Sequence, residues 1–296
     1  MEFIVQQIIS GLAVGSTYSL VALGFVLTFG VLNILNIAHV QTIMLAPMSI
    51  VLLVASGMPM VLATVLAFFI VAAFGCAVFF VGLKPFAGLG GRSTYLASFI
   101  ASFGISMLVE NLVGSQLGSE PRSFPLPFPT DLWHVGNIII VPINVITLIV
   151  AAITLVGLAY IVGQTNFGRE MRAVAENADV SATQGISVNR TILATVTCAS
   201  LLGGLSGILF AADSHVVSPY MGFEYGLKGL VVMIVGGITS PSGAVIAGLM
   251  LGVLESVTVV YISSVYRDVV TFGLLFAVLL VRPQGLFVGV SREARP

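Results

Sequence analysis

Long apolar runs constrain this chain more than any other feature of its sequence. Runs of about 20 mostly apolar residues, the length that a membrane-spanning helix needs, recur along its 296 residues. Only 8% of the residues are charged, whereas a soluble domain carries about 25%. The 11 basic and 12 acidic residues nearly cancel, so nothing indicates nucleic-acid binding or a polybasic membrane anchor. We therefore predict an all-α, polytopic bundle of about eight to ten transmembrane spans in a lipid bilayer.

The runs predict the spans themselves. They lie near 3–30, 36–55, 61–82, 94–114, 138–163, 190–212, 226–238, 243–262 and 268–281. The seventh is short, rich in glycine and contains Lys228, so whether it fully crosses the membrane stays open. The first run has no basic residues before it and no small-residue cleavage site, which predicts a retained span and not a signal peptide. The whole chain, 1–296, is predicted to be one transmembrane domain.

Basic residues in short loops predict the orientation, since such loops favour the cytoplasm. They gather in three places, the loop 83–93, the loop 164–190 and the tail: Lys84, Arg92, Arg169, Arg172, Arg190, Arg282, Arg292 and Arg295. The long loop 114–137 has one Arg, two acidic residues and four prolines, and is predicted to be a rigid cap on the outer face. The N-terminus is then outside and the C-terminus cytoplasmic.

Small residues predict how the helices pack. Lipid gives no hydrophobic drive for helix association, so close contacts need Gly, Ala or Ser. Three pairs have the small-xxx-small spacing: Gly11 with Gly15, Gly203 with Gly207, and Gly248 with Gly252. We expect a compact bundle whose helices touch at these glycines.

The stretch NFGREMRAVAENADVSATQGISVNR, 166–190, holds six charged residues between apolar runs. From Gly168 to Gly185 it predicts one short amphipathic helix bounded by two glycines. Its mildly apolar face follows a three-four spacing: Met171, Val174, Ala175, Ala178 and Ala182. Arg172 and Glu176 lie on the other face, four residues apart, and can pair. Such a helix suits docking into a groove of a soluble partner, while a solvated loop explains the same charges equally well.

This stretch resembles the cytoplasmic loop of permease subunits of bacterial branched-chain amino acid ABC importers. Ten positions agree with the family pattern: Gly168, Met171, Arg172, Ala173, Ala175, Asn177, Ala182, Gly185, Ile186 and Val188. In that family the loop carries a coupling helix that seats in the nucleotide-binding subunit. The resemblance extends to 15–39 and to the C-terminal half, including the ending from Arg282 to Leu286. It implies that the 168–185 helix, with Glu176 among its residues, couples this chain to an ATPase.

The resemblance also implies partners and cargo. It implies an importer in the bacterial inner membrane with a second, related permease chain, two ATPase subunits and a periplasmic substrate-binding protein. ATP and Mg would belong to the ATPase subunits, so no cofactor or metal is expected in this chain. Branched-chain amino acids are the first expected cargo, with urea, short amides and small aromatic acids as alternatives. One departure bears on cargo: after Asn36 to His39 the family usually has Gly and an acidic residue, whereas this chain has Val40 and Gln41.

Polar side chains within spans are candidates for a substrate pathway, because they are costly in lipid. The candidates are Asn36, His39, Gln41 and Glu255. Each has an alternative role as a structural hydrogen-bonding group. Glu110 and Asn111 are expected to be solvated at the outer interface, and Lys228 is expected to pair with Glu224 at the outer membrane edge.

No catalytic grouping is found in the sequence. It has no G-x-x-x-x-G-K-[ST] phosphate loop, no Gly-x-Ser-x-Gly elbow and no histidine pair at metal-ligand spacing, and Cys76 and Cys198 read as packing residues. An integral membrane enzyme is therefore the weakest hypothesis. An ion-coupled carrier or channel remains the alternative to the importer permease, although it would have no use for a docking helix.

Overall fold

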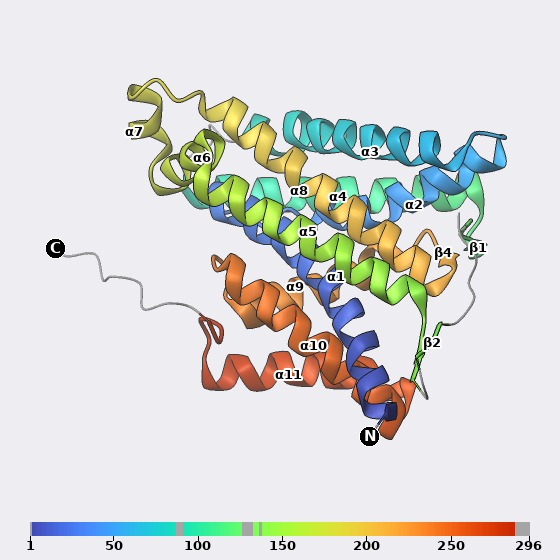
Figure 1. The fold of residues 1–296 in the computed structure, drawn as a ribbon. Helices are drawn as coiled ribbons and strands as arrows, with labels where there is room; N and C mark the ends of the chain where they lie inside the picture. Colours follow the sequence, from blue (N-terminus) through green and yellow to red (C-terminus); the bar gives the residue numbers. More distant parts are fainter. Residues whose placement is uncertain (1, 87–90, 126–132, 136–137, 288–296) are drawn as a thin grey trace.

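The computed structural model describes residues 2–86, 91–125, 133–135 and 138–287, and its helices lie side by side in a bundle (Figure 1). The helices are α1 Glu2–Leu32, α2 Val40–Ala55, α3 Met60–Ala77, α4 Gly91–Leu117, α5 Pro142–Gln164, α6 Asn166–Glu176, α7 Ala178–Thr183, α8 Val188–Ser214, α9 Met221–Gly236, α10 Pro241–Tyr261 and α11 Arg267–Val281. Short 3₁₀ turns are η1 Ile37–His39, η3 Lys84–Phe86 and η4 Ser264–Tyr266, and a π turn, η2 Val78–Leu83, continues α3. The short strands are β1 Arg122–Ser123, β2 Trp133–Val135, β3 Ile138–Ile140 and β4 Val216–Val217.

The predicted polytopic bundle is confirmed. Among the described residues, eight helices are long and apolar enough to cross a membrane. The predicted seventh span begins earlier than expected, because α9 starts at Met221 and not at 226. Its 16 residues rise about 24 Å, less than the roughly 30 Å of a bilayer core. The question of a full crossing, left open by the sequence, is not answered by this length, and α9 is not among the eight helices.

The predicted fifth span is wrong at its beginning. Residues 138–140 form β3, which pairs with β2 in an antiparallel ladder, and helix α5 begins only at Pro142. The residue before a proline is held in an extended conformation, and Val141 has φ −81° and ψ 118°. The run of β-branched residues ahead of this proline therefore continues as a strand and not as a helix.

Helix α1 is the centre of the bundle and packs on α5, α8, α9 and α10. The predicted glycine contacts are confirmed. A Cβ on Gly15 would lie 2.6 Å from the Gly248 carbonyl oxygen, and a Cβ on Gly11 would lie 2.7 Å from Val253 Cα. A Cβ on Gly207 of α8 would likewise strike the backbone of Ile43 in α2. Only glycine allows these backbones to approach so closely.

The two ends of the bundle differ (Figure 1). Helices α6 and α7 lie at one end, and β1, β2 and β4 lie at the other. Strand β1 pairs with β4, and Phe124 N donates to the His215 carbonyl oxygen at 2.9 Å, so the 114–125 part of the long loop is fixed to the end of α8. The rest of the predicted cap includes 126–132 and 136–137, which lie outside the described residues.

We predict that Gly15→Ala destabilises the bundle, while Gly273→Ala in α11 does not. The new methyl group at position 15 would collide with the backbone of α10. Overpacking of this kind costs about 1–3 kcal/mol. Position 273 has no atom within 4 Å of a Cβ, and alanine is the better helix former by about 1 kcal/mol. Thermal unfolding of both purified variants in detergent measures the difference. Equal melting temperatures would contradict the assigned α1–α10 contact.

Candidate functional site

The charged stretch forms two helices and not the single predicted one. Helix α6 begins at Asn166, and Thr165 caps it by accepting from Gly168 N at 3.3 Å. Asn177 ends α6 in an extended conformation and caps α7, with its Oδ1 accepting from Val180 N at 3.0 Å. Asparagine favours such a cap over a helix interior because its side chain competes for backbone hydrogen bonds. The predicted boundary at Gly185 is present, with a φ of +87° that glycine adopts at a helix end.

The apolar face of α6 lies against its own bundle. Met171 and Val174 are buried, at 4% and 3% exposed, where α6 packs on α1, α5 and α8. Ala173 and Ala175 are half-buried, whereas Ala178 and Ala182 on α7 are exposed. The expectation that this face docks a partner is therefore wrong for α6, since the face is already covered. The surface left for a partner is the polar side of α6 together with α7.

Three contacts fix α6 to its neighbours. A Cβ on Gly168 would lie 2.6 Å from the Ile161 carbonyl oxygen, so glycine lets α6 pack on the end of α5. Arg172 donates to the Val162 carbonyl oxygen of α5 and forms no ion pair with Glu176, so the predicted pair is absent. Thr191 of α8 donates to Glu170 at 3.3 Å. Helix α6 is therefore bonded to both α5 and α8.

The helical structure is interrupted between α1 and α2, and three of the four predicted pathway residues lie in this interruption or in the first turn of α2. Asn33 has a φ of +51°, and Asn36, His39 and Gln41 are all buried. His39 faces α1: its Nε2 lies 3.4 Å from the Val21 carbonyl oxygen, and its ring meets Phe25 edge-on at 4.8 Å between centroids. His39 thus contacts α1, whereas the polar groups described next belong to α4.

Helix α4 presents a row of polar side chains to this break. We call Thr94, Ser98, Ser102, Ser106 and Glu110 the α4 polar stripe. Ser102 Oγ accepts from Ile37 N at 3.2 Å. Gln41 Nε2 donates to Ser106 Oγ at 2.9 Å and to Glu110 Oε2 at 3.2 Å. Glu110 therefore accepts a hydrogen bond from a neighbouring helix. The expectation that it is simply solvated is wrong.

The sequence analysis missed the α4 polar stripe, although a signal for it exists. Its members recur every four residues, which brings them to neighbouring turns of one helix. The residues between them are mostly exposed apolar groups such as Ile100 and Met107. Serine is common in transmembrane helices as a packing residue, so a four-residue repeat of it attracts attention only once its buried partners are known.

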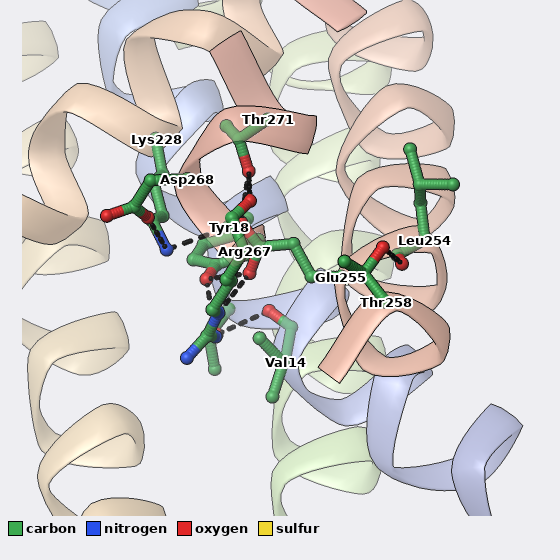
Figure 2. Close-up of polar contacts among 10 residues, drawn as sticks. Val14, Tyr18, Lys228, Leu254, Glu255, Thr258, Arg267, Asp268 and Thr271 are labelled. Carbon is green, nitrogen blue, oxygen red and sulfur yellow. Dashed lines mark hydrogen bonds and ion pairs between the residues drawn. The ribbon is translucent and has the colours of Figure 1, made fainter. Parts of the chain in front are cut away.

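The fourth predicted pathway residue, Glu255, belongs to a separate cluster (Figure 2). Its Oε2 accepts from Tyr18 OH at 2.7 Å and from Arg267 Nε at 2.6 Å, and Arg267 Nη2 also donates to Tyr18 OH at 2.9 Å. Its Oε1 lies 3.3 Å from Lys228 Nζ and accepts from Thr271 Oγ1. We call these residues, with Asp268, the Glu255 network.

The Glu255 network joins four helices, α1, α9, α10 and α11, and balances its own charge. Lys228 lies 3.0 Å from Asp268 as well as beside Glu255, so the expected pair with Glu224 is wrong. The Lys228 and Glu255 side chains are 4% and 1% exposed, whereas Asp268 is 64% exposed. A buried ion pair persists only when further hydrogen bonds complete it. Both oxygens of Glu255 are occupied within the chain, which favours a structural role over contact with cargo.

A cavity of about 280 Å³ lies between the helices at the end of the bundle that carries α6 and α7. Its walls come from α1, α4 and α8, from the end of α3, and from the α6–α7 pair. Thr94 of the α4 polar stripe, Lys84, Val174 of α6 and Ala178 of α7 all line it. Helices α6 and α7 therefore form one wall of a cavity that also touches the first residue of the α4 polar stripe.

A bundle of membrane-crossing helices with polar groups inside it and a pair of amphipathic helices at one end defines a polytopic transport protein. A family model described as the permease component of the branched-chain amino acid transport system matches residues 7–279. The chain belongs to this family of membrane permeases.

Several relatives match nearly the whole chain. The branched-chain amino acid permease BraD of Pseudomonas aeruginosa is 31% identical over 290 residues, 95% of this chain and 94% of that protein. The permease LivH of Escherichia coli K12 is 30% identical over 298 residues, 96% and 95% of the two chains. The nucleoside ABC transporter permease NupB of Lactococcus lactis is 37% identical over 113 residues, 38% of this chain and 31% of that protein. No solved structure matches the chain.

We predict that Glu255→Gln destabilises the folded protein more than Lys228→Met does. Removing one partner of a buried ion pair costs about 3–5 kcal/mol, and Glu255 is the partner of both cations, the buried Lys228 and the half-buried Arg267. Without Lys228, by contrast, Glu255 keeps Arg267 and Asp268 faces solvent. Thermal unfolding of the two variants in detergent measures the order, and the reverse order would contradict this account of the network.

Proposed function

We propose that this chain is a translocating permease subunit of an ATP-driven, binding-protein-dependent importer. The observation that carries the proposal is the match to the family over 7–279, together with relatives covered almost end to end. Family membership also favours this function over an ion-coupled carrier. The chain performs translocation and no covalent chemistry, while ATP and Mg are used by separate ATPase subunits.

Coupling to the ATPase would occur at the α6–α7 pair. Arg172, Glu176 and Ala182 are exposed there, and Val180 is 49% exposed. The side of α6 that faces the bundle carries Met171, Gly168 and Ala173, which would act by holding α6 in place. Gly185 would act by ending α7. Because α6 is bonded to α5 and α8, a push from an ATPase subunit on α7 would move these helices as a unit and rock the bundle between inward and outward openings.

The partners are proposed from the family. They are a second, related permease chain, two nucleotide-binding subunits and a periplasmic binding protein that delivers cargo to the end carrying β1 and β4. The apolar groove of about 490 Å³ that Phe68, Leu158 and Leu202 help to line offers a surface for lipid or for the second permease.

The proposed cargo is a branched-chain amino acid. The relatives that cover nearly all of the chain are named for branched-chain amino acid transport, whereas the nucleoside permease matches only 38% of it. Urea, short amides and small aromatic acids remain alternatives, because Gln41 stands where the family pattern usually has an acidic residue. Retention of radiolabelled leucine, urea and benzoate by the partner binding protein would separate these choices.

The proposed orientation puts α6 and α7 in the cytoplasm of the inner membrane, the N-terminus outside and the C-terminus inside. In a background with Cys76 and Cys198 replaced by alanine, we predict that Thr183→Cys reacts with an impermeant maleimide only in inside-out vesicles. Glu120→Cys, exposed at the other end, should react only in right-side-out cells. The opposite labelling pattern would invert the topology.

We predict that Val180→Asp with Ala182→Asp separates the ATPase from an intact permease. Unpaired charges buried in an interface cost about 2–5 kcal/mol or more, so association should weaken at least about tenfold. Val216→Asp is the matched control, because Val216 is 42% exposed at the opposite end of the bundle. Co-purification of the ATPase subunit with each variant measures the effect. Equal recovery from both variants would refute docking at α7.

A further inference from the structure

The cavity beside α6 and α7 is apolar on one side and polar on the other. Its volume of about 280 Å³ equals that of about nine molecules of liquid water. The buried part of its lining, at most 9% exposed, is apolar: Val31, Ile34, Phe79, Leu83 and Val174. The polar part lies at helix ends, where Lys84 begins η3 and Thr94 and Asn189 lie in the first turns of α4 and α8. A ligand that fits both sides is amphiphilic.

The polar side of this cavity is positive. Among the described residues that line it, Lys84 is the only charged one. No carboxylate of the described residues forms an ion pair with Lys84, whose Nζ lies 5.3 Å from the centre of the Phe80 ring. Helices α4 and α8 both begin at the cavity, and the N-terminal end of a helix carries a partial positive charge. The polar side therefore favours an anionic group.

One hydroxyl on the polar side has no partner. The Thr94 Oγ1 atom is buried, and among the described residues no group forms a hydrogen bond with it. Buried polar groups in a native structure are nearly always paired, so an unpaired one indicates a partner such as a ligand or water. A threonine hydroxyl can donate to an anionic oxygen. Thr94 therefore fits the same kind of ligand as Lys84.

One wall of the cavity reaches the outer surface of the bundle on α4. Tyr95 lines the cavity and is 48% exposed. Further along α4, Leu96, Ile100 and Phe103 are 57%, 64% and 39% exposed. Exposed apolar side chains on a membrane-spanning helix contact lipid tails or another helix. An acyl chain can therefore run from the cavity along α4 into the bilayer.

A π turn forms another wall of the cavity. Turn η2 places Phe79 and Leu83 in the lining. A Cβ on Gly82 would lie 2.8 Å from Ile105 Cδ1, so this glycine lets the turn pack closely on α4. Turns of this kind are rare in proteins and occur frequently at functional sites. The position of η2 therefore agrees with a binding role for the cavity.

We propose that this cavity binds an anionic phospholipid from the leaflet on the side of α6 and α7. The lipid phosphate lies at Lys84, Thr94 and Asn189. One acyl chain begins against Phe79 and Leu83 and continues along the exposed face of α4. Basic pockets between transmembrane helices bind the headgroups of anionic lipids in this way. The proposal does not depend on the proposed importer function.

The bound lipid connects the α6–α7 pair to the rest of the bundle. Val174 of α6 and Ala178 of α7 line the cavity together with residues of α4 and α8. Helix α7 is largely exposed, so the lipid adds a contact to a helix that has few others. The anionic lipid content of the leaflet therefore affects how firmly α7 is held.

Quenching of tryptophan fluorescence by brominated lipid tests the site in the full-length chain. Trp133→Phe removes the single tryptophan, and Tyr95→Trp then places a reporter on the cavity wall. Leu280→Trp is the control reporter, because Leu280 is 70% exposed in the last turn of α11. In phosphatidylcholine vesicles, brominated phosphatidylglycerol should half-quench the Tyr95→Trp reporter at a lower lipid fraction than the control. Equal half-quenching fractions would overturn the proposal.

Two variants in the Tyr95→Trp background test the headgroup contacts. Lys84→Gln should raise the half-quenching fraction about fivefold, the effect of one positive charge on anionic-lipid binding. Thr94→Val keeps the shape of the side chain and should also raise this fraction about fivefold, the effect of one lost hydrogen bond. Because the Thr94 hydroxyl has no partner in the chain, a purely structural role predicts unchanged or higher stability and an unchanged fraction. An unchanged fraction in either variant would overturn the site.

Arg282→Gln is the matched control for charge. Arg282 is exposed where α11 ends and does not line the cavity. This variant should leave the half-quenching fraction of the Tyr95→Trp reporter unchanged. An equal effect of Lys84→Gln and Arg282→Gln would indicate general surface charge and overturn the site.

Two further measurements separate the lipid from its parts. Inorganic phosphate should restore no fluorescence relative to chloride at equal ionic strength, because it has no chain for the apolar side of the cavity. Restoration by inorganic phosphate would indicate a site for the free anion and overturn the lipid assignment. Brominated phosphatidylcholine, whose headgroup has no net charge, should half-quench both reporters at equal fractions. Preferential quenching of the Tyr95→Trp reporter by this lipid would indicate an apolar groove without headgroup selection, which would also overturn the proposal.

Discussion

The close approach of α1 to α10 governs the rest of the bundle. Lipid tails are as apolar as leucine, so helices in a membrane associate by contact between backbones and not by leaving the solvent. Gly11 and Gly15 of α1 meet Gly248 and Gly252 of α10 at distances that no side chain allows. With α1 fixed at the centre, the other helices must place their polar groups against it or against one another. Both polar clusters of the molecule follow from this arrangement.

The Glu255 network and the α4 polar stripe differ in how completely their buried polar groups are paired. In the Glu255 network every charge has a partner from another helix, so the network holds α1, α9, α10 and α11 together without an opening for cargo. Along the α4 polar stripe, donors and acceptors are only partly matched, and several buried atoms are without partners. A fully paired polar network makes a structure rigid, whereas an unpaired buried polar group is costly. The Glu255 network thus ties α1 to α9, α10 and α11, whereas the α4 polar stripe ties α4 to α2 and to the turn before it.

The sequence predicted the bundle and its glycine contacts because both depend on local patterns. Span length, the spacing of Gly203 and Gly207, and the ten matched positions of the charged stretch are all readable along the chain. The partners that a side chain meets on another helix cannot be read along the chain in this way. Glu224 offers Lys228 a carboxylate four residues away, yet Lys228 pairs with Glu255 and Asp268. Because Lys228 is buried, ion pairs with two carboxylates are more favourable for it than one pair at the surface. Likewise the sequence placed the apolar face of α6 outward, because nothing local reveals that α5 and α8 cover it.

The burial of that face changes how the proposed coupling would work. A helix that docked through Met171 and Val174 would have to leave the bundle to meet its partner, and the force would reach α5 and α8 only through the chain ends. With these side chains buried and Arg172 bonded to α5, α6 instead forms a rigid part of the bundle. Asn177 then separates this fixed helix from α7, which remains exposed. The break at Asn177 therefore divides the charged stretch into α6, which is bonded to the bundle, and α7, which is exposed, and both border the cavity that Thr94 also lines.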